Sequence, residues 1–206
     1  MARLPLWERK VWVANNTRPD GGVSAELTQA QMECDPATTK SPEFLIGHAI
    51  KWLQECCLEK YQIDILRKHD EIEELEKRLH RFRSLNETGL RGLGKDIVKF
   101  TIERIDKNSL LKILELQKSN LGTLKLLEKL LASVTALEFA KFHMAPLFGV
   151  YDLRGADAHL SSADIDNCYK RIEIDREQNF ITQGEMLLKN VAATIGVIGT
   201  QIKKYN

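Results

Sequence analysis

One short segment of the chain combines three side chains that can do chemistry, namely Arg154, Asp157 and His159. The guanidinium of an arginine is always charged and holds a phosphate through a rigid fork of N–H donors. A histidine titrates near neutral pH and can therefore transfer a proton as a general acid or base. The combination predicts chemistry on a phosphodiester. RNA fits best, because its ribose 2′-OH can serve as an internal nucleophile.

In the mechanism that these residues suggest, Arg154 binds the scissile phosphate and stabilises the charge that develops on its oxygens. His159 acts as a general base on the 2′-OH or as a general acid to the leaving oxygen. Asp157 pairs with Arg154 or orients His159, and Asp152 is a second orienting candidate. Tyr151 stacks on a base or packs in the core. The mechanism requires no cofactor and no metal ion, and the sequence offers no obvious metal site.

The spacing of the motif sets a condition on this mechanism. Arg154 and His159 would lie about 140° apart on an ideal helix, so they would not share a face. They converge if the helix ends near Gly155, or if they belong to different subunits of a dimer. The structural alternative is an arginine that forms a salt bridge with Asp152 or Asp157, and a histidine that caps a helix end.

Four arginines with Phe82 between them form the best basic patch of the sequence. They are Arg78, Arg81, Arg83 and Arg91. This patch could follow an RNA backbone, or it could offset the acidic run from Glu71 to Glu76. Although 29% of the residues are charged, the net charge is only +1, which excludes nucleic-acid binding through bulk positive charge. Any contact with RNA must therefore come from a local patch, which dimerisation would double.

Length and composition indicate an ordinary globular protein. The 206 residues suffice for one domain with its own core, and 43% of them are hydrophobic. The four cysteines include no Cys-x-x-Cys pair, and free cysteines suit a reducing compartment. The N-terminus lacks a signal-peptide pattern, and no apolar run approaches ~20 residues. We therefore expect a cytoplasmic protein with no membrane association.

Residues 1–40 differ in composition from the rest of the chain and carry three of its five prolines. The sequence from Pro19 to Gly22 predicts a turn, and Trp7 to Ala14 is the only strand-like run. We interpret this segment as an extended arm or as the remnant of another domain. Trp7 and Trp12 would anchor it to the helical body or mark a partner surface.

From Ser41 onward the apolar residues recur at helical spacing, which predicts an all-α, multi-helix bundle over residues 41–206. Ser41 and Pro42 fit the cap and first position of a helix that would continue to about Leu79. Gly89, Gly92 and Gly94 predict a connection between helices.

Further along the chain, helices are predicted over Lys95–Lys118, Thr123–His143 and Ile181–Lys204. Pro146 is expected to open the segment that carries the arginine and histidine, and Ser161 with Asp164 resembles a capping box for a short helix. In the last helix, Gly196 and Gly199 cost stability, but their small size permits close contact with another helix.

An Arg-x4-His motif inside a mostly helical bundle resembles the HEPN superfamily, whose ribonucleases carry an R-x4–6-H motif. The resemblance covers the bundle of residues 41–206 and identifies Arg154 and His159 as the catalytic pair. It implies a bundle that dimerises and forms a composite active site from two copies of the motif. Gly155 occupies the position after the arginine, where the family often has Asn or Asp, and Asp157 would supply the polar group. Such proteins are often metal-independent endoribonucleases of toxin–antitoxin, CRISPR-linked or antiviral defence systems.

We therefore expect a HEPN-type RNA endonuclease that acts as a homodimer or inside a larger complex, with an antitoxin or another protein as a partner. The alternative is a non-catalytic helical adaptor or dimerisation module that binds through its charged helix and its glycine-containing last helix. A third hypothesis is that the chain is one piece of a split or truncated protein. Arg154 and His159 exposed in a cleft would favour the nuclease, and both buried with intrachain partners would favour the adaptor.

Overall fold

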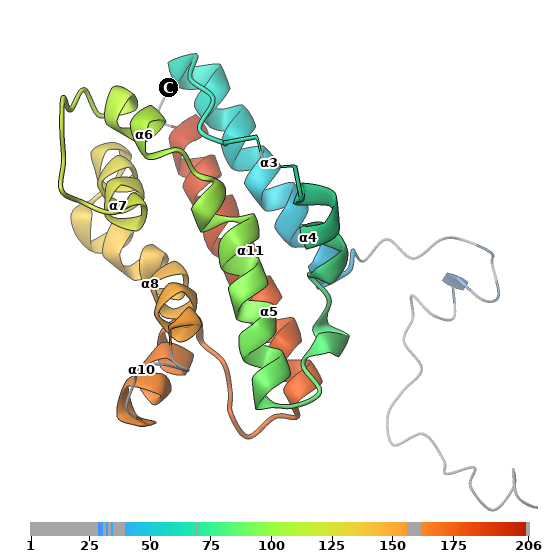
Figure 1. Cartoon of the computed structure of the whole chain (residues 1–206). Helices are drawn as coiled ribbons and strands as arrows, with labels where there is room; N and C mark the ends of the chain where they lie inside the picture. The colour runs from blue at the N-terminus through green and yellow to red at the C-terminus, as the bar shows by residue number, and fades with distance from the viewer. Residues whose placement is uncertain are drawn as a thin grey trace, which may run out of the picture. The chain divides into compact units, whose positions relative to one another are not determined.

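The computed structural model describes residues 40–68, 70–155 and 162–204, together with Gln29, Ala30, Met32 and Cys34. The contacts within the chain divide it into two units, Met1–Lys40 and Ser41–Asn206. The predicted strand-like run and turn of the first unit lie outside the described residues. The second unit is a multi-helix bundle, and the predicted all-α class is confirmed (Figure 1).

The described helices of the bundle follow one another with short connections. Two of them are single turns of 3-10 helix, η1 (Arg81–Arg83) and η2 (Ile102–Arg104). The α-helices are α3 (Pro42–Tyr61), α4 (Ile72–Arg78), α5 (Glu87–Phe100), α6 (Lys107–Ile113), α7 (Thr123–Val134), α8 (Leu137–Arg154), α10 (Ser162–Ile172) and α11 (Phe180–Lys204). Among the residues that the structure describes, no helix has the length and apolar composition needed to cross a membrane.

Helix α3 begins as the sequence predicts. The Ser41 hydroxyl accepts a hydrogen bond from the N–H of Phe44, and Pro42 occupies the first turn. The helix ends at Tyr61, because Gln62 adopts a left-handed backbone with φ 56° and donates its N–H to the carbonyl of Leu58. The predicted continuation to Leu79 is therefore wrong, and α4 is a separate, short helix.

Helices α3 and α11 form the most extensive helix pair among the described elements (Figure 1). Gly199 of α11 permits this packing, since a Cβ there would lie 2.8 Å from Cδ1 of Trp52 and 3.3 Å from Cα of Leu53. The predicted close contact is confirmed at this glycine. Gly196 is different, because nothing lies within 4 Å of the position its Cβ would take.

The glycines predicted to form a connection lie inside α5 instead. This helix is capped by Asn86, whose side chain accepts the N–H of Gly89 at 2.8 Å. Its buried face includes Leu90, Leu93 and Ile97, all completely inaccessible to solvent. Each glycine costs a helix up to about 1 kcal/mol, whereas burying one leucine or isoleucine contributes about 1.5–3 kcal/mol. Burial against the rest of the bundle therefore outweighs the glycines.

Two helices that the apolar spacing predicts as continuous are interrupted at threonines. The hydroxyl of Thr101 donates to the carbonyl of Ile97 at the end of α5, and that of Thr135 donates to Leu131 at the end of α7, both at 2.7 Å. Such side-chain bonds compete with the next turn of helix. The predicted helices over Lys95–Lys118 and Thr123–His143 are therefore each split, with α6 and the start of α8 lying beyond the breaks.

Helix α8 carries the arginine of the motif at its last residue. Pro146 lies inside this helix and does not open it, so that prediction is wrong. The helix ends at Arg154, and the N–H of Gly155 donates to the carbonyl of Asp152 at 2.9 Å. A helix end near Gly155 is the first of the two conditions set above for Arg154 and His159 to converge, and α8 meets it. Ser161, the predicted cap of α10, lies outside the described residues, and α11 agrees with prediction to within one residue.

Candidate functional site

Arg154 lies at the surface of the bundle with two neighbours that hold its guanidinium. It forms an ion pair with the carboxylate of Glu103 in η2, and its Cζ lies 4.5 Å from the centroid of the Tyr151 ring. Its side chain is 34% exposed. Asp152, one of the two partners predicted from the sequence, instead accepts a hydrogen bond from Arg171 at 2.9 Å. Arg154 is thus paired within the chain but remains accessible to a ligand.

The other two members of the predicted catalytic group, Asp157 and His159, lie outside the described residues. Their place in the chain is fixed by the end of α8 at Arg154 and by the start of α10 at Ser162. The segment that carries them therefore begins at Gly155, directly after the arginine.

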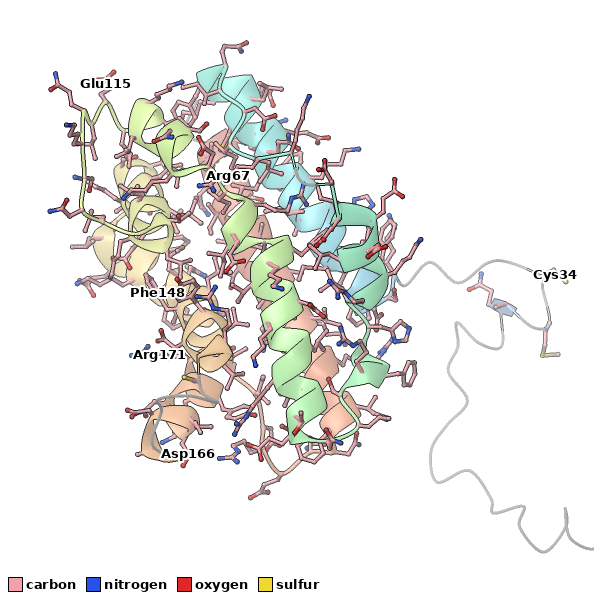
Figure 2. All side chains as sticks on the ribbon, in the orientation of Figure 1. Cys34, Arg67, Glu115, Phe148, Asp166 and Arg171 are labelled. Atoms are coloured by element: carbon pink, nitrogen blue, oxygen red, sulfur yellow. The ribbon has the colours of Figure 1, made fainter. Side chains whose placement is uncertain are left out.

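A pocket of about 320 Å³ opens beside Arg154, and we call it the aromatic pocket. Its lining includes both neighbours of that guanidinium, so Arg154 lies at its edge. A second cation, the Lys125 ammonium, lies 4.7 Å from the centroid of the Phe148 ring. Phe148 belongs to α8 and is labelled in Figure 2. The lining residues are Ile102, Glu103, Gly122, Thr123, Leu124, Lys125, Phe148, Tyr151 and Asp152.

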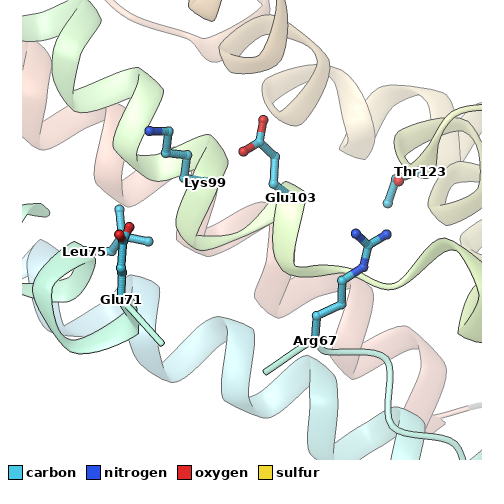
Figure 3. Close-up of a pocket in the computed structure, with 6 residues that line it drawn as sticks. All are labelled: Arg67, Glu71, Leu75, Lys99, Glu103 and Thr123. Atoms are coloured by element: carbon cyan, nitrogen blue, oxygen red, sulfur yellow. The ribbon is translucent and has the colours of Figure 1, made fainter. Parts of the chain in front are cut away.

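A larger pocket of about 470 Å³, the polar pocket, shares Glu103 and Thr123 with the aromatic pocket (Figure 3). Its other lining residues are Arg67, Glu71, Leu75 and Lys99. Figure 3 shows the Arg67 guanidinium extending toward Thr123 from the connection between α3 and α4. The two pockets therefore form neighbouring compartments that meet at one carboxylate and one hydroxyl.

The backbone fixes Arg67 beside η2. Leu66 and Ile105 form an isolated antiparallel bridge, and the N–H of Arg67 donates to the carbonyl of Arg104 at 2.8 Å. The Arg67 side chain donates to Asp106 at 3.2 Å. Although burial alone raises the pKa of Asp106, the N–H and hydroxyl of Ser109 together with Arg67 hold it below its usual value. The carboxylate that positions Arg67 is therefore ionised at neutral pH.

The four predicted RNA-binding arginines are each paired within the bundle. Arg81 binds Glu43 at 3.0 Å and Glu185 at 2.6 Å, which attaches η1 to α3 and α11. Hydrogen bonds from Lys189 and Arg81 outweigh the effect of burial and hold the pKa of Glu185 below its usual value. Both of these carboxylates lie outside the acidic run of Glu71–Glu76.

The remaining three arginines pair with carboxylates of α5. Arg78 and Arg83 both pair with Asp96, which is only 7% exposed. Arg91 pairs with Glu87 one turn earlier in the same helix, at 2.6 Å. The two pairs with Asp96 join η1 and α4 to α5. The patch therefore has a structural role in addition to any contact with RNA.

Sequence reasoning selected Arg154 and Tyr151 but missed the residues around them. Glu103, Lys125 and Phe148 come from η2, α7 and α8, and no local motif links those segments. Among the described residues, no group of three or more His, Cys, Asp or Glu side chains is placed to hold a metal ion. No family model, curated protein or solved structure matches this chain.

Proposed function

We propose that this chain is a metal-independent RNA endonuclease of the HEPN type, in which Arg154 binds the scissile phosphate. The observation that carries the proposal is the position of Arg154 at the end of α8, accessible to solvent and at the edge of a pocket. A surface ion pair such as that with Glu103 is worth about 0–1 kcal/mol. A phosphate can therefore compete for the guanidinium or bind donors that Glu103 leaves free.

The chain itself keeps the proposed general base near this phosphate. His159 follows Arg154 by five residues, and five fully extended residues span at most about 18 Å. Because α8 ends at Arg154, the intervening residues are not required to continue its helix. His159 from the same chain, or from a second copy in a homodimer, then supplies the proton transfers.

The proposed reaction cleaves RNA by internal transfer. The 2′-oxygen attacks the adjacent phosphorus and gives its proton to His159, while Arg154 stabilises the charge that builds on the phosphate oxygens. The bond to the 5′-oxygen breaks, and that oxygen takes up a proton from a protonated histidine. The products are a 2′,3′-cyclic phosphate and a 5′-hydroxyl. A role in a toxin–antitoxin or antiviral defence system belongs to the same proposal.

Cleavage of labelled single-stranded RNA in the presence of EDTA tests this function. We expect Arg154→Ala and His159→Ala each to lower the rate at least about a hundredfold, the scale of losing a charge-stabilising or acid–base group. Arg176→Ala is the matched control, because Arg176 also pairs with a carboxylate, Asp166, and lies 4.9 Å from a tyrosine centroid. Full cleavage by Arg154→Ala and His159→Ala would overturn the proposal. Circular dichroism that shows intact helices is the condition for counting a loss of cleavage in its favour.

A second candidate function, a helical adaptor or dimerisation module, is favoured by a different observation. Arg154 and all four arginines of the predicted patch already have carboxylate partners within the chain. Large apolar side chains are also exposed on α3 and α8, namely Phe44, Leu45 and Phe142. Wild-type protein that self-associates in light scattering but cleaves no RNA would support the adaptor.

A further inference from the structure

The aromatic pocket has the volume and lining of a site for a flat, partly polar ring. Phe148 and Tyr151 lie one turn apart on α8, and the buried side chains of Ile102 and Leu124 complete the apolar part of the lining. A volume of about 320 Å³ falls within the range of small-molecule sites. Every nucleobase has a π-face that stacks on aromatic side chains, and single-stranded RNA presents its bases in this way.

The polar groups of the pocket are mainly hydrogen-bond acceptors. Glu103 and Asp152 contribute carboxylates, and Thr123 adds a hydroxyl. Each carboxylate has about four lone-pair sites, so the ion pairs with Arg154 and Arg171 leave acceptor capacity free. Adenine, cytosine and guanine carry exocyclic amino donors, whereas uracil presents two carbonyl oxygens and donates only through its ring N–H. The lining therefore favours a base with an amino group over uracil.

Two cations lie beside the rings that line the aromatic pocket. Arg154 and Lys125 each lie over the ring of a residue that lines the pocket, at 4.5 and 4.7 Å from the ring centroids. Beyond Glu103 the polar pocket adds Arg67, whose guanidinium extends toward Thr123 (Figure 3). A strand with one base in the aromatic pocket would thus meet positive charge on its phosphates.

We propose that the aromatic pocket is a nucleotide subsite, which holds one base against Phe148 and Tyr151 and the attached phosphate at Arg154. The inference rests on the proposed function and deepens it, since it names the residues that select the base beside the scissile phosphate. It assigns a positioning role to residues outside the Arg-x4-His motif. The same chemistry would also bind a free nucleotide, and the test separates the two sources.

Binding is measured by fluorescence anisotropy with a short RNA that is 2′-O-methylated throughout, because blocking the 2′-oxygen prevents cleavage. We expect Phe148→Leu and Tyr151→Leu each to weaken binding roughly tenfold, as expected for the loss of one base-stacking contact. Phe142→Leu is the matched control, since Phe142 lies on the same helix, is 68% exposed and does not line this pocket. Its binding should stay within about twofold of wild type.

A second arm titrates AMP, CMP, GMP and UMP. If UMP binds most weakly of the four, the result supports a lining rich in hydrogen-bond acceptors. If the RNA binds more tightly than every mononucleotide, the result identifies an RNA strand as the ligand. Affinities of the mononucleotides that equal that of the RNA identify a free nucleotide at the same subsite. No binding of either ligand, or equal weakening by Phe142→Leu, overturns the subsite. Because Tyr151 is 38% exposed, Tyr151→Leu keeps the test decisive if Phe148→Leu fails to fold.

The failures of the two proposals are distinguishable. If Phe148→Leu and Tyr151→Leu cleave unmodified RNA as fast as wild type, the nuclease proposal stands and the subsite proposal fails. Binding that depends on both rings, in a protein that cleaves no RNA, retains the subsite and removes the nuclease.

Discussion

The indole of Trp52 lies against Gly199, so that a Cβ added to this glycine would come within 2.8 Å of Cδ1 and 3.1 Å of Nε1. The contact joins α3 to α11, the most extensive helix pair of the described bundle. It also distinguishes two glycines that look equivalent in the sequence, because Gly196 has open space at the same position.

Alanine at these two glycines should have opposite effects on stability. Gly199→Ala forces the rigid indole to move, which we expect to lower the free energy of unfolding by about 1–3 kcal/mol despite the better helix propensity of alanine. Gly196→Ala meets no atom and should raise it by up to about 1 kcal/mol. Urea denaturation followed by circular dichroism measures both values. Equal stabilisation by the two substitutions would show that the packing is not as described.

Glu103 competes with phosphate for Arg154, so neutralising it should strengthen RNA binding. Glu103→Gln keeps a side-chain carbonyl in the aromatic pocket but removes an ion pair worth about 0–1 kcal/mol. We expect the 2′-O-methylated RNA to bind up to about fivefold more tightly, with the largest effect at low salt. Glu138→Gln is the control, since Glu138 pairs with Lys141 at 3.0 Å and does not line this pocket. Weaker binding by Glu103→Gln would contradict the competition.

The charge of Asp106 should make stability fall in acid. Folding lowers the pKa of this carboxyl, so its contribution is complete above the unfolded value of about 3.9 and is lost as pH falls through the lower folded value. Asp106→Asn retains a good cap for α6 but loses the attraction to Arg67. We expect the variant to be less stable by up to about 1 kcal/mol at pH 7, with the difference shrinking as the pH falls below about 3.9. Thermal denaturation across this range checks the slope, and a constant difference would contradict the assignment.

The thiols should react at very different rates. Burial raises the pKa of Cys57 to about 12 and also raises the pKa values of Cys56 and Cys168, while Cys34 is exposed. Since the thiolate is the reactive species, a disulfide-exchange reagent at pH 7.5 should label one cysteine rapidly in the native protein and all four in denaturant. Cys34→Ser should remove the fast phase. Rapid labelling of a second thiol would mean that the core around α3 or α10 opens readily.

Local sequence signals predicted the all-α class, the start of α3 and the extent of α11. They failed where burial against distant elements, or a side-chain hydrogen bond to the backbone, decides the structure. Leu90 and Leu93 are buried deeply enough to hold the glycine-containing α5 in a helix, which residues 89–94 alone do not reveal. Thr101 and Thr135 end helices by bonding to a carbonyl one turn earlier, although the apolar spacing continues past them.

The same distinction between local signals and distant contacts applies to the residues of the candidate site. Arg154 belongs to a compact motif and could be selected from the sequence, and the end of α8 meets one of the conditions set for it. Glu103 lies 51 residues earlier, and only the tertiary packing of the bundle brings it to that arginine. Phe148 lines the pocket, but nothing in the sequence around it distinguishes a pocket-lining aromatic residue from one packed in the core.

The pairing of α3 with α11 also bears on how the protein is made. A ribosome adds about 5–20 residues per second, so the apolar face of α3, with Ile46, Ile50 and Leu53, is synthesised long before Phe180–Lys204 exists to cover it. The nascent chain exposes that apolar face until the residues of α11 have been synthesised. The pairing of α3 with α11 can form only after α11 has left the ribosomal tunnel, and binding by chaperones is most valuable before that point.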